Sequence, residues 1–167
     1  MAAKKTVIAA STHKKVILQT FDRKNVRGYL NPATLGQGDS VDLMTVDGEH
    51  ELIAVKSVKS IFFVSDFVDD FEPGRKAFLS RPKLDGLWVK MKFRDGDTLE
   101  GIVTNNLLEM LDRGVQVTPP DLHGPTLRIF IPRTSLTELS VQGVVGIARR
   151  TARPAAVAVG QTNLFNE

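Results

Sequence analysis

The chain has 167 residues, of which 42% are hydrophobic and 25% are charged, a composition typical of a folded globular protein and not of a disordered or fibrous one. This length suffices for one ordinary domain or two very small ones, and it is too short for a (β/α)8 barrel of about 250 residues. The chain contains no cysteine, which excludes disulfides, thiolate catalysis and cysteine zinc sites and fits a reducing cytoplasm.

The positive charge is concentrated at the two ends of the chain. Lys and Arg number 22 against 19 Asp and Glu, giving a net charge of +3, yet between residues 16 and 142 there are 18 acids and only 15 bases. A folded domain that binds nucleic acid usually carries a basic patch. We therefore expect only a weak, salt-dependent contact with nucleic acid, made by the basic ends. The bases of these ends are Lys4, Lys5, Lys14, Lys15, Arg149, Arg150 and Arg153.

Short β-rich runs follow the N-terminal basic tail, which spans residues 1–14. They alternate apolar and polar residues and are separated by turns rich in Asp, Asn and Gly, a pattern that indicates antiparallel strands. The predicted strands are 16–18, 26–30, 41–44, 52–55 and 58–64. Five such runs predict a small β-barrel over residues 15–67.

The same order of runs recurs after a linker that spans residues 68–86. The second set of predicted strands is 89–93, 99–103, 115–117, 127–131 and 136–139. Aligning Gly28 with Gly101 also places Val16 on Val89, so we interpret residues 87–142 as a second copy of the first unit. A glycine inside the second strand of each copy favours a sharp bend that helps to close a small barrel.

Two stretches of the second copy carry a family resemblance. Residues 93–101 read Phe-Arg-Asp-Gly-Asp-Thr-Leu-Glu-Gly and residues 131–139 read Ile-Pro-Arg-Thr-Ser-Leu-Thr-Glu-Leu. They resemble the strand–turn–strand motif and the last strand of Sm-like small β-barrels, a pattern that SH3-like barrels largely share. The resemblance implies an all-β protein of two small antiparallel barrels packed together.

In the Sm-like family an Arg-Gly-Asp or Arg-Gly-Asn element before the last strand contacts RNA. The corresponding residues here are 55–57, Val-Lys-Ser, and 132–134, Pro-Arg-Thr, so that element is missing. Nucleic-acid binding therefore stands as an alternative function. It would use the basic ends together with Lys56, Lys59, Arg128 or Arg133.

The sequence contains no recognisable catalytic or cofactor motif. His13, His50 and His123 share no metal-ligand spacing, and neither a phosphate-binding loop nor a nucleophile elbow occurs. We therefore expect no enzyme activity, metal or cofactor. A ligand-sensing barrel is a further alternative, because Arg23 and Arg27 fit the Arg-x-x-x-Arg of PilZ-type domains. The second PilZ element, (Asp/Asn)-x-Ser-x-x-Gly, is absent, which favours a plain charged turn.

The C-terminal tail, residues 143–167, ends with two large apolar residues in a polar context. Gln161, Leu164 and Phe165 resemble the bacterial sliding-clamp-binding pentapeptide Gln-Leu-(Ser/Asp)-Leu-Phe, although Thr162 replaces its leucine. The resemblance implies that Leu164 and Phe165 fill a pocket on a protein partner. With no export signal and no apolar run of about 20 residues, the first hypothesis is a cytoplasmic, non-enzymatic adaptor.

Overall fold

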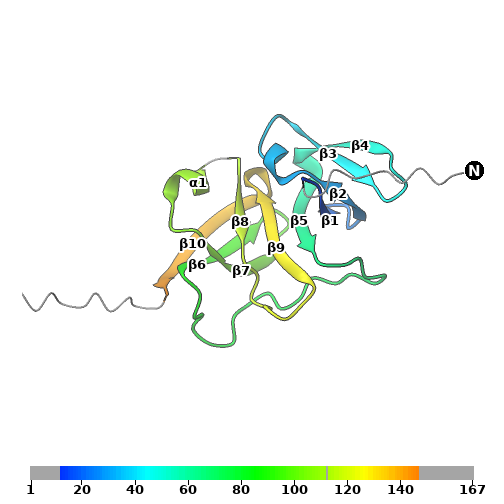
Figure 1. The fold of residues 1–167 in the computed structure, drawn as a ribbon. Coiled ribbons are helices and arrows are strands. Elements are labelled where there is room, and N and C mark those ends of the chain that lie inside the picture. The colour runs from blue at the N-terminus through cyan, green and yellow to red at the C-terminus, as the bar shows by residue number, and fades with distance from the viewer. Residues whose placement is uncertain (1–11, 112, 147–167) are drawn as a thin grey trace, which may run out of the picture.

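The computed structural model describes residues 12–111 and 113–146, and the regular structure in this part of the chain consists almost entirely of antiparallel strands (Figure 1). The first five strands are β1 (Lys14–Thr20), β2 (Asn25–Leu30), β3 (Ser40–Thr45), β4 (His50–Ala54) and β5 (Val58–Val64). The next five are β6 (Gly86–Phe93), β7 (Thr98–Val103), β8 (Gly114–Val117), β9 (Thr126–Pro132) and β10 (Leu136–Val145). The expected all-β fold is confirmed.

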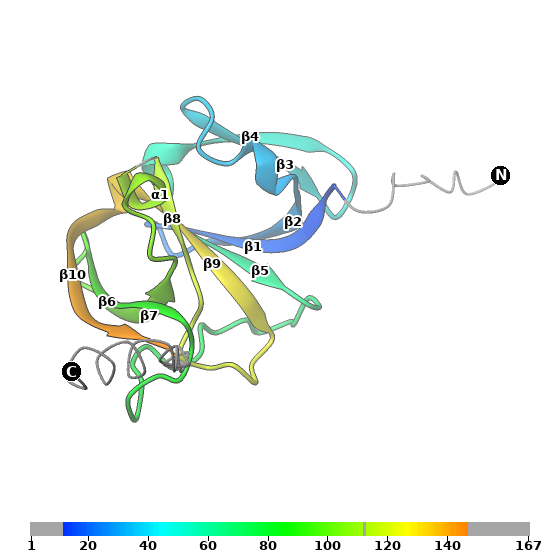
Figure 2. The same ribbon diagram turned by 60° about the vertical axis from the view of Figure 1, so that its left-hand side comes forward.

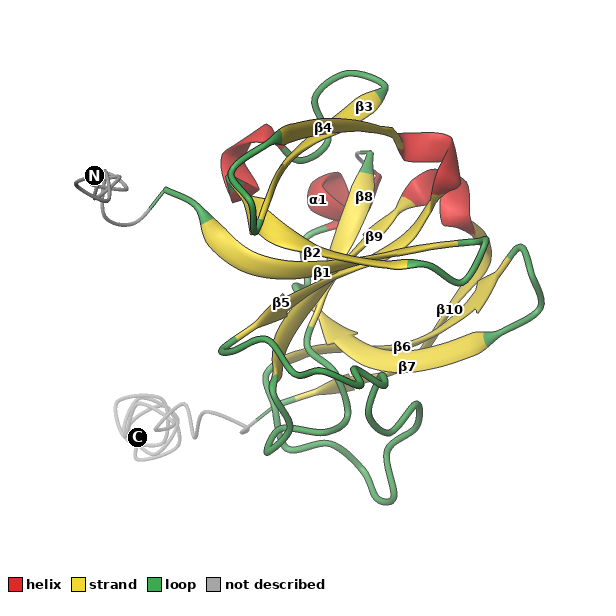
Figure 3. Ribbon diagram, turned by 90° about the vertical axis from the view of Figure 1, so that its right-hand side faces the viewer, coloured by secondary structure: helices red, strands yellow, loops and turns green. Residues whose placement is uncertain are grey.

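Helix is confined to short turns between strands (Figure 3). These are η1 (Pro32–Thr34), η2 (Val55–Ser57), α1 (Leu107–Leu111) and η3 (Arg133–Ser135). The described residues include no helix whose length and hydrophobicity would let it cross a membrane. The turns η2 and η3 occupy corresponding places, because each directly precedes the last strand of its half of the chain.

The strands form one seven-stranded and one three-stranded sheet. Their orders are β4-β3-β2-β1-β5-β9-β8 and β10-β6-β7. A single bridge between Ile102 and Thr118 connects β7 with the end of β8. The described strands therefore follow one open ladder from β4 to β10, and no closed barrel is found among them (Figure 2). The arrangement as two separate barrels stays a prediction.

The two halves of the ladder have matching pairing registers. Val16 of β1 lies opposite Gly28 and Phe63, and Val89 of β6 lies opposite Gly101 and Val141. The register of β1 with β5 and that of β6 with β10 also shift at the same place. At this shared shift the residue left out of the pairing is Lys59 in β5 and Thr137 in β10, and a second shift in β10 leaves out Gln142.

The glycines of β2 and β7 are required by close contact with the neighbouring third strand. A Cβ atom on Gly28 would lie 2.5 Å from the carbonyl oxygen of Met44, and one on Gly101 would lie 2.0 Å from a methyl group of Val117. Sequence reasoning singled out both positions but attributed them to a bend. The contact provides a direct reason, since no side chain fits between these strands.

The core is divided by the central strands β1 and β5, which are buried on both faces. Ile17 and Phe62 point into one cluster with β6, β8 and β9, whereas Val16, Leu18 and Phe63 belong to a second cluster with β3 and β4. Such two-sided burial is typical of strands inside a protein, whose sequences are continuously apolar. The two halves thus share β1 and β5 as a common wall.

The strands extend beyond the predicted unit boundaries at both ends. β1 begins at Lys14, inside the predicted N-terminal tail, and β10 continues to Val145, inside the predicted C-terminal one. The extension of β10 is stabilised because it pairs with β6 as far as Val145 opposite Gly86, and Val145 is buried. Residues 68–85 form a connector without helix or strand, attached through Phe71, whose ring centroid lies 5.0 Å from that of Phe62.

Candidate binding groove between the two halves

The two halves are joined by the antiparallel pairing of β5 with β9. Ile61 lies opposite Phe130 and Phe62 opposite Ile129. At the end of this ladder the hydroxyl of Ser135, which is fully buried, donates a hydrogen bond of 2.7 Å to the carbonyl of Val58. This bond fixes η3 next to the start of β5, and η2 and η3 are in contact.

A groove of about 790 Å³ opens where these turns meet the loop between β2 and β3; we call it the junction groove. Its walls are formed by residues 34–41 and by both turns. Leu35, Val41 and Phe130 provide apolar surface, and residue Phe130 as a whole is only 8% exposed. The volume lies within the range of about 300–1,000 Å³ that is usual for small-molecule sites.

Three exposed cations line the junction groove. Lys56 comes from η2, Arg133 from η3 and Arg113 from the residue before β8, and Asp39 is the one acid among the lining residues that the structure describes. A cluster of cations beside apolar surface suits an anionic ligand that also carries a flat apolar part.

Backbone contacts hold these cations in place. The guanidinium of Arg113 donates to the carbonyl of Gly38 at 3.2 Å, and the amide of Arg133 donates to the carbonyl of Arg113 at 2.9 Å. Below them, the guanidinium of Arg94 lies 3.9 Å from the ring centroid of Phe21 and donates to the carbonyl of Lys56. The groove is therefore built by residues of both halves, which supply a fixed scaffold for its charged rim.

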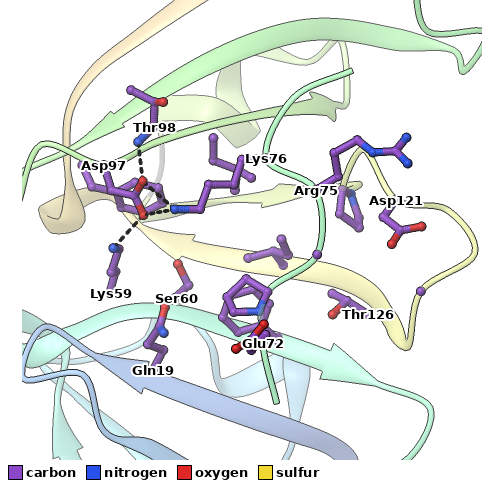
Figure 4. Close-up of a pocket in the computed structure, with 18 of the residues that line it drawn as sticks. Gln19, Lys59, Ser60, Glu72, Arg75, Lys76, Asp97, Thr98, Asp121 and Thr126 are labelled. Atoms are coloured by element: carbon purple, nitrogen blue, oxygen red, sulfur yellow. Dashed lines mark hydrogen bonds and ion pairs between the residues drawn. The ribbon is translucent and has the colours of Figure 1, made fainter. Parts of the chain in front are cut away.

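A second, smaller cavity of about 250 Å³ lies under the connector and is called the connector pocket (Figure 4). Lys59 of β5 donates to Asp95 at 2.7 Å and to Asp97 at 3.0 Å, and Lys76 of the connector donates to Asp97 at 2.7 Å. Burial of Lys59 opposes its charge, but these hydrogen bonds outweigh it and raise the pKa of Lys59 above its ordinary value. The charges neutralise one another, so we interpret this cavity as a structural ion-pair network.

The carboxylates of this network respond in the opposite direction. Burial disfavours the charge of Asp97, but hydrogen bonds from Lys76 and Lys59 outweigh it and lower its pKa. The pKa of Asp95 is lowered too, because its bond from Lys59 likewise outweighs burial. The ion pairs therefore connect β5, in the first half, with the β6–β7 turn of the second half.

The predicted nucleic-acid contacts lie in different surroundings. Lys14 is exposed at the start of β1, whereas Lys15 donates to Asp66 at 2.7 Å, a bond that raises its pKa. Arg128 lies above the ring of Phe63 and donates to Gln116. The remaining predicted residues lie outside the described part of the chain: Lys4, Lys5, Arg149, Arg150 and Arg153, and the partner-binding Gln161, Leu164 and Phe165.

Of the four cations weighed for nucleic-acid binding within the body, the structure brings Lys56 and Arg133 together in the junction groove and places Lys59 in the connector pocket. Arg113 was missed, because it lies in a loop and belongs to no motif. Its one sequence signal is its position before the third strand of the second half. His50 forms an exposed pair with Asp42 at 2.9 Å, and within the described ranges no three ligand-type side chains cluster as a metal site.

Residues 12–143 match the sequence model of a family of unknown function, DUF6982. The chain belongs to this family. No curated protein and no solved structure matches it. The matched span includes every described residue that lines the junction groove, and it ends before Gln161, Leu164 and Phe165.

Proposed function

We propose that this protein is a non-enzymatic binding protein made of two similar five-stranded units that resemble Sm-like small β-barrels, and that its junction groove binds single-stranded nucleic acid. The observation that carries this proposal is the meeting of Lys56 and Arg133. They come from corresponding turns of the two units and lie on one apolar groove together with Arg113.

The interpretation as two units is supported by strand order and register. Each half has its fifth strand beside its first, and its third strand between the second and the fourth. The turns correspond as well. The backbone amide of Val55 donates to the backbone carbonyl of Asp39, the residue before β3, and the backbone amide of Arg133 donates to the backbone carbonyl of Arg113, the residue before β8. A duplication accounts for this agreement more simply than two independent origins.

The groove offers both contacts that a single strand of nucleic acid needs. Its cations suit phosphates, and its apolar surface suits the face of a base. The body between residues 16 and 142 has an excess of acids, which argued against nucleic acid. That argument concerned the whole body, whereas a bound phosphate feels mainly the charges within a Debye length of about 8 Å. Among the described residues that line the groove, these are the cations Lys56, Arg113 and Arg133 and the acid Asp39.

The test is titration of fluorescently labelled single-stranded RNA and DNA, followed by anisotropy at several salt concentrations. We expect Lys56→Glu/Arg133→Glu to weaken binding by about tenfold or more and to flatten its dependence on salt. The matched control is Lys90→Glu/Lys92→Glu, which reverses two exposed charges on β6 and should change affinity by less than about twofold. Equal losses in both variants, or no binding by the unaltered protein, would overturn the proposal.

A second proposed function rests on the sequence of the C-terminal tail. Gln161, Leu164 and Phe165 match three positions of the sliding-clamp-binding pentapeptide, and this segment lies outside the span that matches the family. The tail would then recruit a protein partner, with a bacterial sliding clamp as the candidate, independently of the groove. A pull-down with purified clamp should retain the unaltered chain and lose Leu164→Ala/Phe165→Ala. Equal retention of both proteins would exclude this role.

A further inference from the structure

The open ladder of strands ends in β4 on one side and β10 on the other. Within the described residues, β4 pairs only with β3 and β10 only with β6. These two edges occupy the same places in their halves as the two strands that form the junction: β4 is a fourth strand like β9, and β10 is a fifth strand like β5. The molecule therefore carries, on its outside, the two components of its own internal interface.

The pairing registers give the correspondence residue by residue. Ile53 lies opposite Val41 as Ile131 lies opposite Val115, so Leu52 corresponds to Phe130. Leu139 lies opposite Met91 as Ile61 lies opposite Leu18, so Leu139 corresponds to Ile61. The internal pair of Ile61 and Phe130 thus has an external counterpart in Leu139 and Leu52.

The position on β4 that corresponds to Phe130 holds a large apolar side chain, Leu52, which is exposed. Leu52 is 73% exposed, whereas Phe130 at the corresponding position is 8% exposed because β5 and its neighbours cover it. On β10, Val141 is 53% exposed, whereas its counterpart Phe63 is buried. Exposed apolar residues on an unpaired strand edge are a template for pairing with another chain.

We propose that β10 of one molecule pairs antiparallel with β4 of a second copy of this chain, in the register of β5 with β9. Leu139 would lie opposite Leu52, Ser140 opposite Glu51 and Val141 opposite His50. No like charges face each other in this register. The contact is head-to-tail, so it adds further copies until a ring closes or a filament forms.

The side chains of the two turns support this register. Ser135 of η3 donates across the junction to the carbonyl of Val58, at the start of β5. Its counterpart in η2 is Ser57, which instead donates at 2.8 Å to the carbonyl of Ala54 in its own turn. In the proposed contact, Leu136 of the molecule that supplies β10 takes the place of Val58, and its carbonyl becomes the acceptor within reach of Ser57 of the second copy, which supplies β4.

The contact between copies is expected to be weaker than the internal one. The positions that hold Phe62 and Phe63 in β5 hold Ser140 and Val141 in β10, so less apolar surface is covered. Assembly should accordingly depend on protein concentration, whereas the β5·β9 junction is permanent because both strands belong to one chain.

The first test measures the mass of the full chain by sedimentation over a range of concentrations. The unaltered protein should exceed its monomer mass of 18.4 kDa increasingly as concentration rises. Leu52→Glu blocks the β4 edge, Val141→Glu blocks the β10 edge, and each alone should stay monomeric. Leu79→Glu, at an exposed position on the connector, is the matched control and should assemble like the unaltered chain.

Mixing the two blocked variants gives the decisive result. Leu52→Glu keeps an intact β10 and Val141→Glu keeps an intact β4, so an equimolar mixture should form a dimer of twice the chain mass and nothing larger. A mixture that stays monomeric, or an unaltered chain that stays at 18.4 kDa at every concentration, overturns the proposal. Regained association also shows that both variants are folded.

The register itself is tested by cross-linking, which is straightforward because the chain has no cysteine. Glu51→Cys mixed with Ser140→Cys should give a disulfide-linked dimer under mild oxidation, because directly opposed residues bring their Cβ atoms within about 4.5–5.5 Å. Glu51→Cys mixed with Leu79→Cys is the control. Linking of either variant to itself as readily as to its partner would contradict the head-to-tail pairing.

Discussion

The fifth strands of the two halves, β5 and β10, each pair with the first strand of their half in the same register, but their other surroundings are opposite. β5 is covered on both sides by β1 and β9, and Ile61, Phe62 and Phe63 along it are all buried. β10 pairs only with β6 in the described structure, and Leu139, Ser140 and Val141 replace those three residues. The backbone pattern thus sets where an interface can form, and the side chains decide whether it is permanent.

The residue left out of the pairing at the register shift that both strands share shows the same contrast between β5 and β10. Lys59 of β5 lies between the halves, where its side chain is 13% exposed and binds Asp95 and Asp97. Thr137 of β10 is exposed and donates only to the carbonyl of Lys92. The same position therefore holds a lysine that forms ion pairs between the halves in β5, but an exposed threonine in β10.

We expect the largest difference between β5 and β10 when an apolar side chain is removed and the free energy of unfolding is measured. Phe62→Ala removes a buried ring that packs on Phe71 and should lower the free energy of unfolding by about 3–5 kcal/mol. Val141→Ala trims an exposed side chain and should change it by less than about 0.5 kcal/mol. Urea denaturation followed by tryptophan fluorescence measures both values, because Trp88 lies on β6. Similar losses in the two variants would show that β10 is as buried as β5.

The strand glycines provide the next comparison. Gly28→Ala and Gly101→Ala each place a methyl group into the third strand of their half, and each should cost about 1–3 kcal/mol of unfolding free energy. The cost should be larger at Gly28, where the nearest obstacle is a backbone oxygen, than at Gly101, where it is a valine side chain.

Gly143→Ala is the matched control for these glycines. It lies on β10, nothing lies within 4 Å of its added methyl group, and its effect should stay within about 0.5 kcal/mol. Thermal unfolding of the three variants ranks them directly. Neutral substitutions at Gly28 and Gly101 would mean that the strands do not approach as closely as described.

Much of this architecture was predictable because local patterns determine it. Alternating apolar residues and Asp-Gly turns located the strands, and the positions of Gly28 and Gly101 aligned the two halves before any pairing was known. Lys56 and Arg133 could be singled out because they precede the last strands. The groove itself could not be predicted, because it depends on the pairing of β5 with β9, which are distant in sequence, and on Arg113 in a loop.

We expect the smallest change in the free energy of unfolding when the ion pairs of Lys59 and Lys76 are removed. Lys59→Met removes a largely buried partner of Asp95 and Asp97 and should lower the free energy of unfolding by about 1–2 kcal/mol at neutral pH. Lys76→Met removes a half-exposed partner of Asp97 and should cost less than about 0.5 kcal/mol. Chemical denaturation of the two variants beside the unaltered chain gives both numbers.

The pH dependence distinguishes an ion pair from simple packing at Lys59. The lowered pKa values of Asp95 and Asp97 mean that their contribution is present above the ordinary carboxyl value of 3.8 and is lost as pH falls through the lower folded values. The raised pKa of Lys59 means that its contribution is present below 10.5 and is lost as pH rises through the higher folded value. The deficit of Lys59→Met should therefore be constant near neutrality and shrink at both extremes. A deficit unchanged at pH extremes would assign it to the packing of the lysine stem, and the ion pairs of Lys59 would then contribute nothing to holding the halves together.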